Sequence, residues 1–316
     1  MAVKMLGVHL AKTFLSYIGK IIECGESLNR KKVLVIGYGI ITRGILKILR
    51  QSNKYTIYLY SRHLNSTKNG SLLVSEDELS DVINQVDFVI TCFSNHIEMD
   101  SFINDIILNV QSLHKTIVID FTTSRIDCVE RFKIAVEANE GYYIEAPFTG
   151  SKSGSNSGQL SIFIHFDKSL TYNKKELMEL LKTISKKIYF FEKSTEPTKF
   201  KLIYNSWGAY LLYSIKLFNP LKYGFSPKSQ EVAKTIVCND GWMSLVCHSK
   251  LEQINNQNFD DIHFKIEYMV KDLEYANYSV FHGELREIIF LLQQYRDCLK
   301  NDSGKDYTVI GKNDKL

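Results

Sequence analysis

Short apolar runs alternate with longer amphipathic stretches along the first two thirds of the chain. A short apolar run bounded by polar residues is typical of a strand buried on both faces of a parallel sheet, and the stretches between these runs have helical spacing. The predicted strands are residues 33–37, 55–60, 87–92, 116–120, 142–146, 160–166 and 188–191. The alternation predicts an α/β fold with a doubly wound sheet that continues as far as residue 191.

Only helical patterns remain after residue 195. The predicted helices are residues 198–218, 228–237, 242–248, 262–281 and 285–300. A change from alternating elements to helices alone predicts a domain boundary near residue 195. We therefore expect an α/β domain over residues 30–195 and an all-helical domain over residues 196–316.

A further segment precedes the first strand. Between residues 1 and 29, apolar residues alternate with Lys4, Lys12 and Lys20, and the first acid is Glu23. This pattern predicts an N-terminal amphipathic basic helix. Such a helix is typical of an organellar targeting segment or a membrane-surface helix, and equally of an added helix packed on the domain or on a partner subunit. The segment lacks arginine and a small-residue cleavage signal, which argues against targeting.

The first predicted strand runs into a glycine turn, which a helical pattern follows at once. Gly37 can turn tightly, Gly39 lets the backbone approach a pyrophosphate, and the helix start offers unpaired N–H groups to its charge. The turn therefore predicts a dinucleotide-binding domain of the Rossmann type. The residues that we expect to border the cofactor here are Gly37, Tyr38, Gly39, Ile40 and Ile41. Thr42 occupies the position of the usual third glycine, so an ordinary βα turn is the alternative, and Gly44 is a candidate for relieving helix–strand crowding instead.

The end of the second predicted strand bears on the choice between NAD and NADP. An acid here would hydrogen-bond the ribose of NAD, but the chain reads Tyr60-Ser61-Arg62-His63. Ser61 and Arg62 can bind a 2′-phosphate and no carboxylate follows to repel it, so the sequence favours NADP over NAD. The alternative is that Arg62 is a solvated loop residue.

The third predicted strand also ends in polar residues. Ser94 and Asn95 follow it directly. Because ligands lie at the carboxyl ends of the strands in open α/β sheets, we expect both residues to border the cofactor.

Composition narrows the class of protein. The 316 residues are 45% hydrophobic and 23% charged, which is typical of a globular protein with a full core. The net charge of +4 is small and spread out, so we expect no nucleic-acid partner. The six cysteines show no metal-ligand spacing, which indicates reduced thiols, a cytoplasmic location and no metal site. No apolar run reaches the ~18 residues of a membrane span, so we predict no integral membrane segment.

Six short motifs follow one another between residue 32 and about residue 312. They are Gly37 with Gly39, Asp120-Phe121-Thr122-Thr123, the loop Ala146-Pro147-Phe148-Thr149-Gly150-Ser151 with Gly154, Gly158 and Leu160 after it, Lys201 with Asn205, Lys271-Asp272-Leu273, and Asp306-Tyr307-Thr308-Val309-Ile310. In this order they resemble the β-hydroxyacid dehydrogenase family, which includes 3-hydroxyisobutyrate dehydrogenase and the glyoxylate and succinic semialdehyde reductases and is related to imine reductases.

The chain departs from the family pattern at several positions. Thr42 replaces a glycine, Thr122 replaces a serine and Ile126 replaces a proline, all of which we expect the fold to tolerate. Ser151 replaces the second glycine of the loop, and Tyr204 replaces the first of two paired asparagines. The last two changes touch the substrate pocket, which favours an atypical substrate.

The resemblance implies an enzyme that reduces a small aldehyde or keto acid, or oxidises the matching 3-hydroxy acid, and the end of the second strand adds the expectation that its cofactor is NADP. It implies that Lys201 is the proton donor and acceptor, and that Asn205 holds the substrate or orients Lys201. It further implies a homodimer, through a helical C-terminal domain like that of 6-phosphogluconate dehydrogenase that also contributes to the substrate site. The remaining residues that it assigns are Thr122, Thr149, Gly150 and Ser151 on the substrate carboxylate, with Thr122 also beside the cofactor, and Lys271 near the nicotinamide.

Other interpretations of these residues and of the function stay open. Lys201 and Asn205 are four residues apart, which is also common on solvated helices, and Lys271 alone reads as a helix-surface charge. An imine reductase would reduce a C=N bond in the same cleft, but that branch usually replaces the lysine, so Lys201 favours carbonyl chemistry. A dinucleotide-binding protein without turnover is the third function. A reductase of carboxylic acids also needs a cation besides Lys201, and the sequence identifies none.

Overall fold

The computed structural model describes residues 30–62, 64, 71–166, 170 and 173–312. The predicted amphipathic helix over residues 1–29 lies outside the described residues.

A six-stranded sheet forms the centre of the first half of the chain. Its strands lie in the order β3-β2-β1-β4-β5-β6, and all neighbouring pairs are parallel. This order is typical of dinucleotide-binding domains, and ligands bind where it reverses, outside the carboxyl ends of β1 and β4. The strands are β1 (Lys31–Ile36), β2 (Tyr55–Tyr60), β3 (Leu72–Leu73), β4 (Phe88–Thr91), β5 (Ile117–Asp120) and β6 (Tyr142–Glu145). The predicted doubly wound sheet is confirmed, and β3 is a short edge strand that the sequence pattern did not predict.

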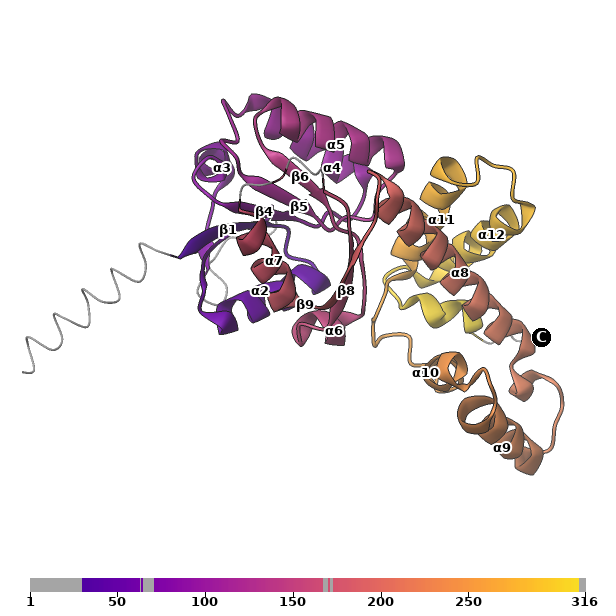
Figure 1. Ribbon diagram of the computed structural model, residues 1–316. Coiled ribbons are helices and arrows are strands. Elements are labelled where there is room, and N and C mark those ends of the chain that lie inside the picture. Colours follow the sequence, from indigo (N-terminus) through magenta and orange to yellow (C-terminus); the bar gives the residue numbers. More distant parts are fainter. Residues whose placement is uncertain (1–29, 63, 65–70, 167–169, 171–172, 313–316) are drawn as a thin grey trace, which may run out of the picture.

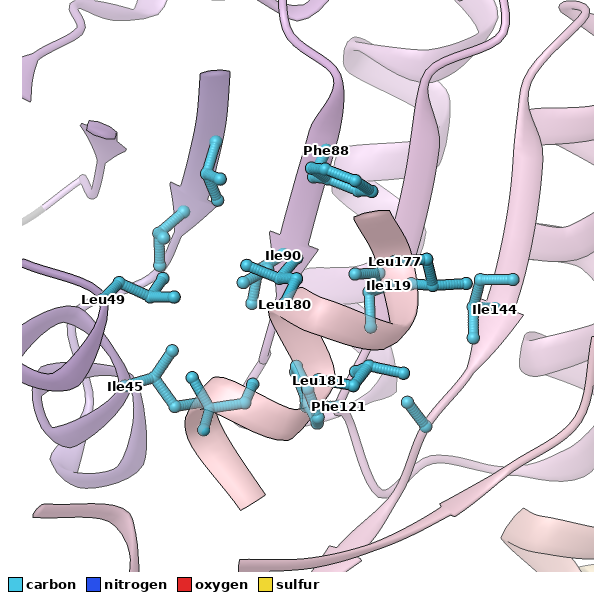
Figure 2. Packing of buried hydrophobic residues seen from close by; sticks show 14 of the residues in the cluster. Ile45, Leu49, Phe88, Ile90, Ile119, Phe121, Ile144, Leu177, Leu180 and Leu181 are labelled. Atoms are coloured by element: carbon cyan, nitrogen blue, oxygen red, sulfur yellow. The ribbon is translucent and has the colours of Figure 1, made fainter. Parts of the chain in front are cut away.

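Helices cover both faces of this sheet, with α2 and α7 on one face and α3, α4 and α5 on the other (Figure 1). The helices of this half are α2 (Ile40–Ser52), α3 (Glu76–Ile83), α4 (His96–Asp105), the 3-10 helix η1 (Ile107–Asn109), α5 (Ile126–Ala138), α6 (Lys152–Asn156) and α7 (Lys174–Ile184). Alternate residues of a strand point to opposite faces, so Val33 and Val35 join the α2–α7 core while Leu34 and Ile36 join the other. Figure 2 shows the first of these cores, with side chains of α2 and α7 against those of β4, β5 and β6.

The chain after β6 builds a second, three-stranded sheet, which corrects the prediction that the large sheet continues to residue 191. Its strands are β7 (Phe148–Thr149), β8 (Leu160–Ile164) and β9 (Ser185–Phe190), in that order. The chain passes from β6 into β7 without a crossover helix, and a parallel addition to β6 needs a connection of about a dozen residues. β7 does not pair with β6; it pairs with β8, which runs antiparallel to it. An isolated bridge between Glu145 and His165, directly after β8, connects this small sheet to β6.

From Glu196 onward the structure is helical, apart from the isolated bridge between Lys265 and Asp306. The elements are α8 (Glu196–Phe218), η2 (Pro220–Lys222), α9 (Pro227–Thr235), the π-helical turn η3 (Ile236–Asp240), α10 (Ser244–Asn255), α11 (Ile266–Ser279), α12 (Arg286–Asp302) and η4 (Tyr307–Gly311). Helix α8 leaves the sheet half and runs through the helical half (Figure 1). The mostly helical second half agrees with the predicted fold class.

A buried carboxylate fixes the start of α8. Glu145, the last residue of β6, is 3% exposed, and its two oxygens accept hydrogen bonds from the backbone N–H groups of Thr195 and Thr198, each at 2.7 Å. Burial raises the pKa of Glu145, and these hydrogen bonds oppose that shift. The edge of the large sheet therefore holds the N-terminus of α8, the longest helix among the described residues.

Gly44 lets α2 approach α6 closely. A Cβ added at Gly44 would lie 2.4 Å from Ser155 Oγ and 2.7 Å from the backbone carbonyl carbon of the same residue. The crowding that Gly44 relieves is therefore between two helices and not between a helix and a strand.

Replacing Gly44 with alanine should destabilise the fold, because the Ser155 backbone must move to admit the methyl group. We expect a loss of about 1–3 kcal/mol in the free energy of unfolding, measured by urea denaturation. Gly208→Ala is the matched control, since it is also helical and a Cβ there meets nothing within 4 Å. The control should be unchanged or more stable by up to ~1 kcal/mol. Equal effects of the two substitutions would contradict the close approach.

Candidate active site

A cleft of about 1450 Å³ lies where the carboxyl ends of the large sheet meet the helical half. It brings together residues from β1, β2, the segment directly after β4, α8 and α11 that are far apart in the sequence. The predicted site residues that line it are Gly37, Tyr38, Gly39, Ile40, Ile41, Ser61, Arg62, Ser94, Thr149, Gly150, Ser151, Lys201, Asn205 and Lys271. The predicted cofactor and substrate residues thus face one continuous space.

Two predicted site residues do not line the cleft. The Asn95 side chain caps α4, where its Oδ1 accepts a hydrogen bond from the Glu98 N–H at 3.0 Å. Thr122 is 2% exposed, and its hydroxyl accepts a hydrogen bond from the Phe93 N–H at 3.0 Å. The Thr122 hydroxyl thus ties the end of β4 to the end of β5, and its neighbour Thr123 lines the cleft instead.

The glycine turn is shaped for a diphosphate. Gly37 has φ of +98°, and a Cβ there would lie 3.2 Å from the Cys92 carbonyl oxygen, so only glycine fits without strain. Gly39 is the N-cap of α2; no side chain caps this helix end and no acid stands in its first turn. The free N–H groups and the helix dipole therefore favour an anion beside Ile40 and Ile41, which line the cleft.

The end of the cleft beside β2 carries charges of both signs. Ser61 and Arg62 line it, as do Glu76 and Glu98. Arg62 Nη2 lies 3.9 Å from Glu98 Oε1, and the Arg62 side chain is half exposed, so this ion pair is weak. The sequence interpretation missed both acids, although each stands in the first turn of a helix that begins beside the cleft, Glu76 in α3 and Glu98 in α4.

Lys201 and Asn205 project from one buried face of α8. Each is 8% exposed, and the Lys201 ammonium lies 5.9 Å from the ring centroid of Phe148 and 5.8 Å from that of Tyr204. The pKa of Lys201 is lowered from 10.5 to about 8, mainly by burial; the Asp272 carboxylate opposes this shift and the charge of Lys271 adds to it. Because Phe148 directly precedes the Thr149-Gly150-Ser151 loop, Lys201 adjoins the predicted substrate loop.

A buried ionic network holds Asn205 in place. Asp272, 1% exposed, accepts a hydrogen bond from Asn205 Nδ2 at 2.5 Å through Oδ2, and its Oδ1 lies 3.0 Å from Lys271 Nζ. Lys271 Nζ also donates to the Thr123 carbonyl at 2.7 Å, which joins α11 to the end of β5. A carboxylate accepts hydrogen bonds and cannot donate them, so it orients the amide N–H₂ of Asn205 toward itself. Asn205 Oδ1 is therefore the atom left for the cleft.

The role of Asp272 was missed at the level of sequence. It belongs to the Lys271-Asp272-Leu273 motif, but its partner Asn205 precedes it by 67 residues. The adjacent lysine and aspartate were the available signal, and the fold supplies the rest.

The sequence model of the NAD-binding domain of 6-phosphogluconate dehydrogenase matches residues 32–191, just over half of the chain. The chain belongs to the β-hydroxyacid dehydrogenase family. This match gives it a dinucleotide-binding domain and supports an oxidoreductase acting on a small molecule. No curated protein sequence matches the chain.

Solved structures share the fold over nearly their whole length. The 3-hydroxyisobutyrate dehydrogenase of Mycobacterium tuberculosis with L-serine is 15% identical with a TM-score of 0.74, covering 89% of this chain and 98% of that one. Psf3 in complex with NADP+ and 2-OPP is 16% identical with a TM-score of 0.72, covering 88% and 98%. An imine reductase from Pseudomonas sp. is 14% identical with a TM-score of 0.54, covering 89% and 98%. At these identities the likeness shows the fold alone.

Asp120, the first residue of the second motif, connects β4, β5 and β6 next to the cleft. Its oxygens accept hydrogen bonds from the Thr91 hydroxyl, the Thr122 N–H and the Tyr143 hydroxyl, at 2.8–3.0 Å. Burial raises the pKa of Asp120, and burial together with that carboxylate raises the pKa of Cys92, which lines the cleft, to about 12. Cys92 is therefore a neutral thiol and a poor nucleophile.

The described residues contain no cluster of three or more His, Cys, Asp or Glu side chains that could hold a metal ion. They also contain no helix that is both long and apolar enough to cross a membrane.

Proposed function

We propose that the chain is an NADP(H)-dependent oxidoreductase that reduces a small aldehyde or keto acid, or oxidises the matching 3-hydroxy acid. The observation that carries this proposal is the buried Lys201, with its pKa lowered to about 8, in the same cleft as the diphosphate turn and the substrate loop. A lysine that exchanges its proton near neutral pH is suited to general acid–base catalysis.

The bound nicotinamide would supply or accept the hydride, and the chain's own residues handle the proton and the substrate. During reduction the Lys201 ammonium donates its proton to the carbonyl oxygen. During oxidation the neutral Lys201 amine accepts the proton of the hydroxyl group. A lysine with the ordinary pKa of 10.5 would be almost entirely charged near neutral pH and unable to act in the second direction.

Asn205 and the substrate loop position the reacting group. Asn205 Oδ1 accepts a hydrogen bond from the Lys201 ammonium or from the substrate hydroxyl, because Asp272 occupies the amide N–H₂. Thr149, Gly150 and Ser151 offer hydroxyl and backbone N–H groups to the substrate carboxylate. Lys271, held by Thr123 and Asp272, would lie near the nicotinamide.

Reduction of a C=N bond is the second candidate, favoured by the imine reductase among the solved structures with this fold. Lys201 supports carbonyl chemistry, as the imine branch usually lacks this lysine.

Cofactor titration followed by turnover tests the proposal. Binding of NADPH and NADH would be measured by fluorescence, and turnover with glyoxylate, succinic semialdehyde, methylmalonate semialdehyde and a cyclic imine. We expect NADPH to bind more tightly and an aldehyde acid to be reduced. Turnover of the imine alone would replace carbonyl chemistry with the second candidate, and binding without any turnover would favour a non-catalytic role.

Lys201→Ala should lower kcat by at least ~10²-fold and leave the affinity for NADPH nearly unchanged. In the wild type, kcat for reduction should fall as the pH rises through about 8, since the ammonium form is the donor, and kcat for oxidation should rise over the same range. The measurement is a pH profile in both directions. Equal activity of the variant and the wild type would refute the role of Lys201.

Arg62→Ala should weaken binding of NADPH and leave NADH unaffected, because only NADPH carries the 2′-phosphate. A loss of about tenfold in NADPH affinity is expected for a half-exposed arginine that loses a charged hydrogen bond. Titration of both cofactors against both proteins checks this. An equal loss of affinity for NADPH and NADH would mean that Arg62 does not bind the 2′-phosphate.

We also propose a homodimer, with α8 at the contact. Trp207 and Phe218 on this helix are 64% and 72% exposed, and Tyr210 between them is 47% exposed. A row of exposed aromatic side chains on one helix is typical of a protein interface.

Light scattering should therefore give the wild type twice the mass of the single chain. Phe218→Glu should shift it toward the monomer, because the contact would bury a charge without a partner. Leu108→Glu, at a residue 54% exposed on the far half of the chain, should leave the mass unchanged. A monomeric wild type would end the homodimer proposal.

A further inference from the structure

The cleft continues beyond Lys201 into the helical half, along one face of α10. Val246, Lys250 and Gln253 line this extension at the three- and four-residue spacing of a single helix face. Tyr307 of η4 lines the cleft next to Lys250. The cleft therefore extends beyond the glycine turn and the Lys201–Asn205 pair.

Lys250 is the cation of this extension, and it lies against an aromatic ring. Its Nζ is 4.9 Å from the centroid of the Tyr307 ring. Burial lowers the pKa of Lys250, and the nearby Asp306 carboxylate opposes that shift. A partly desolvated ammonium gains from a hydrogen-bonding anion, since a ring alone replaces little of its hydration.

Asp306 cannot be that anion, because its oxygens are already used. Oδ1 accepts hydrogen bonds from the N–H and hydroxyl of Thr308 at 3.0 and 2.7 Å. Oδ2 accepts from the N–H groups of His263 and Phe264 at 2.8 and 3.0 Å. The carboxylate thus organises the chain before α11 and is 0% exposed.

Other acids on this side of the cleft do not pair with Lys250. Asp261 is exposed and lies 3.3 Å from His263 Nε2, and Glu252 is exposed to solvent on α10. Across the described ranges, no carboxylate lies within 4.0 Å of the Lys250 ammonium. The half-buried cation faces the cleft and has no ion-pair partner there.

Aromatic side chains connect Lys250 to the catalytic end. Lys201 Nζ lies 5.8 Å from the Tyr204 ring, and both Tyr204 and Tyr307 line the cleft. Phe264 packs edge-on against Tyr307, with their centroids 5.6 Å apart. A ligand that reaches from Lys201 to Lys250 would therefore cross an apolar, aromatic wall.

We propose that Lys250 binds a second anionic group of the substrate, apart from the carboxylate at the Thr149-Gly150-Ser151 loop, while the carbonyl or hydroxyl carbon lies at Lys201. The substrate class is then a dicarboxylic acid whose second carboxylate is separated from the reacting carbon by a spacer. This inference rests on the proposed function for the reacting end, but the anion site itself can be measured without turnover. Lys250 also supplies the second cation that the sequence left unidentified.

Straight-chain dicarboxylates from malonate to pimelate, and their monoamides, are suitable probes. Their binding to the protein would be measured by calorimetry, with and without NADP+. In the wild type, at least one dicarboxylate should bind roughly ten- to hundredfold more tightly than its monoamide, as expected for one charge-assisted hydrogen bond. The chain length with the largest ratio would give the spacing between the two ends of the site.

Lys250→Met should abolish this ratio and leave the monoamide affinity unchanged, whereas Lys250→Arg should keep much of it. Lys228→Met, which removes an exposed lysine of α9, is the matched control and should behave as the wild type. An unchanged ratio in Lys250→Met, or no dicarboxylate preference in the wild type, would overturn the anion site. If the wild type shows the preference for a dicarboxylate over its monoamide but neither binds NADP+ nor turns over a substrate, the result would count against the proposed function alone.

Discussion

The position of α8 at the carboxyl edge of the sheet is the constraint on which the site depends. Glu145 ends β6 and uses both carboxylate oxygens to bind the first N–H groups of α8. Lys201 and Asn205, four and eight residues after Pro197, face the cleft at helical positions that this anchor sets. Without Glu145, two buried N–H groups would lose their partners, at about 1–3 kcal/mol each. A shift of the helix would also carry Lys201 away from the substrate loop.

The hydrogen bonds and ion pair around Asp272 form a second connection between the two halves, and they fix the orientation of the Asn205 side chain. One chain of contacts joins Thr123 of the sheet half, Lys271 and Asp272 of α11, and Asn205 of α8.

The burial that lowers the pKa of Lys201 also opposes folding. Its folded pKa of about 8 lies below the ordinary 10.5, so the cost is fully present below about pH 8 and disappears as the pH rises toward 10.5.

Sequence patterns predicted five of the six strands of the large sheet, the glycine turn and the helical second half, because these depend on local periodicity and turn chemistry. They failed where pairing between distant segments decides the outcome. The chain after β6 pairs with itself in a second sheet, and Thr122 turns its hydroxyl to Phe93 and not to the cleft. Asp272 acquires its role only through Asn205, which no local pattern could indicate. Lys250 carried no motif at all.

The missing third glycine of the turn shows how the two ligand regions are coupled. Thr42 is buried, and its hydroxyl donates a hydrogen bond to the Gly39 carbonyl at 3.2 Å, so the first turn of α2 tolerates a side chain there. A residue without a side chain is needed two positions later, where Gly44 packs closely against Ser155 of α6. Helix α6 follows directly from the Thr149-Gly150-Ser151 loop. The helix that would bind the diphosphate therefore also supports the loop that would bind the substrate, and a displacement of either one must be transmitted to the other.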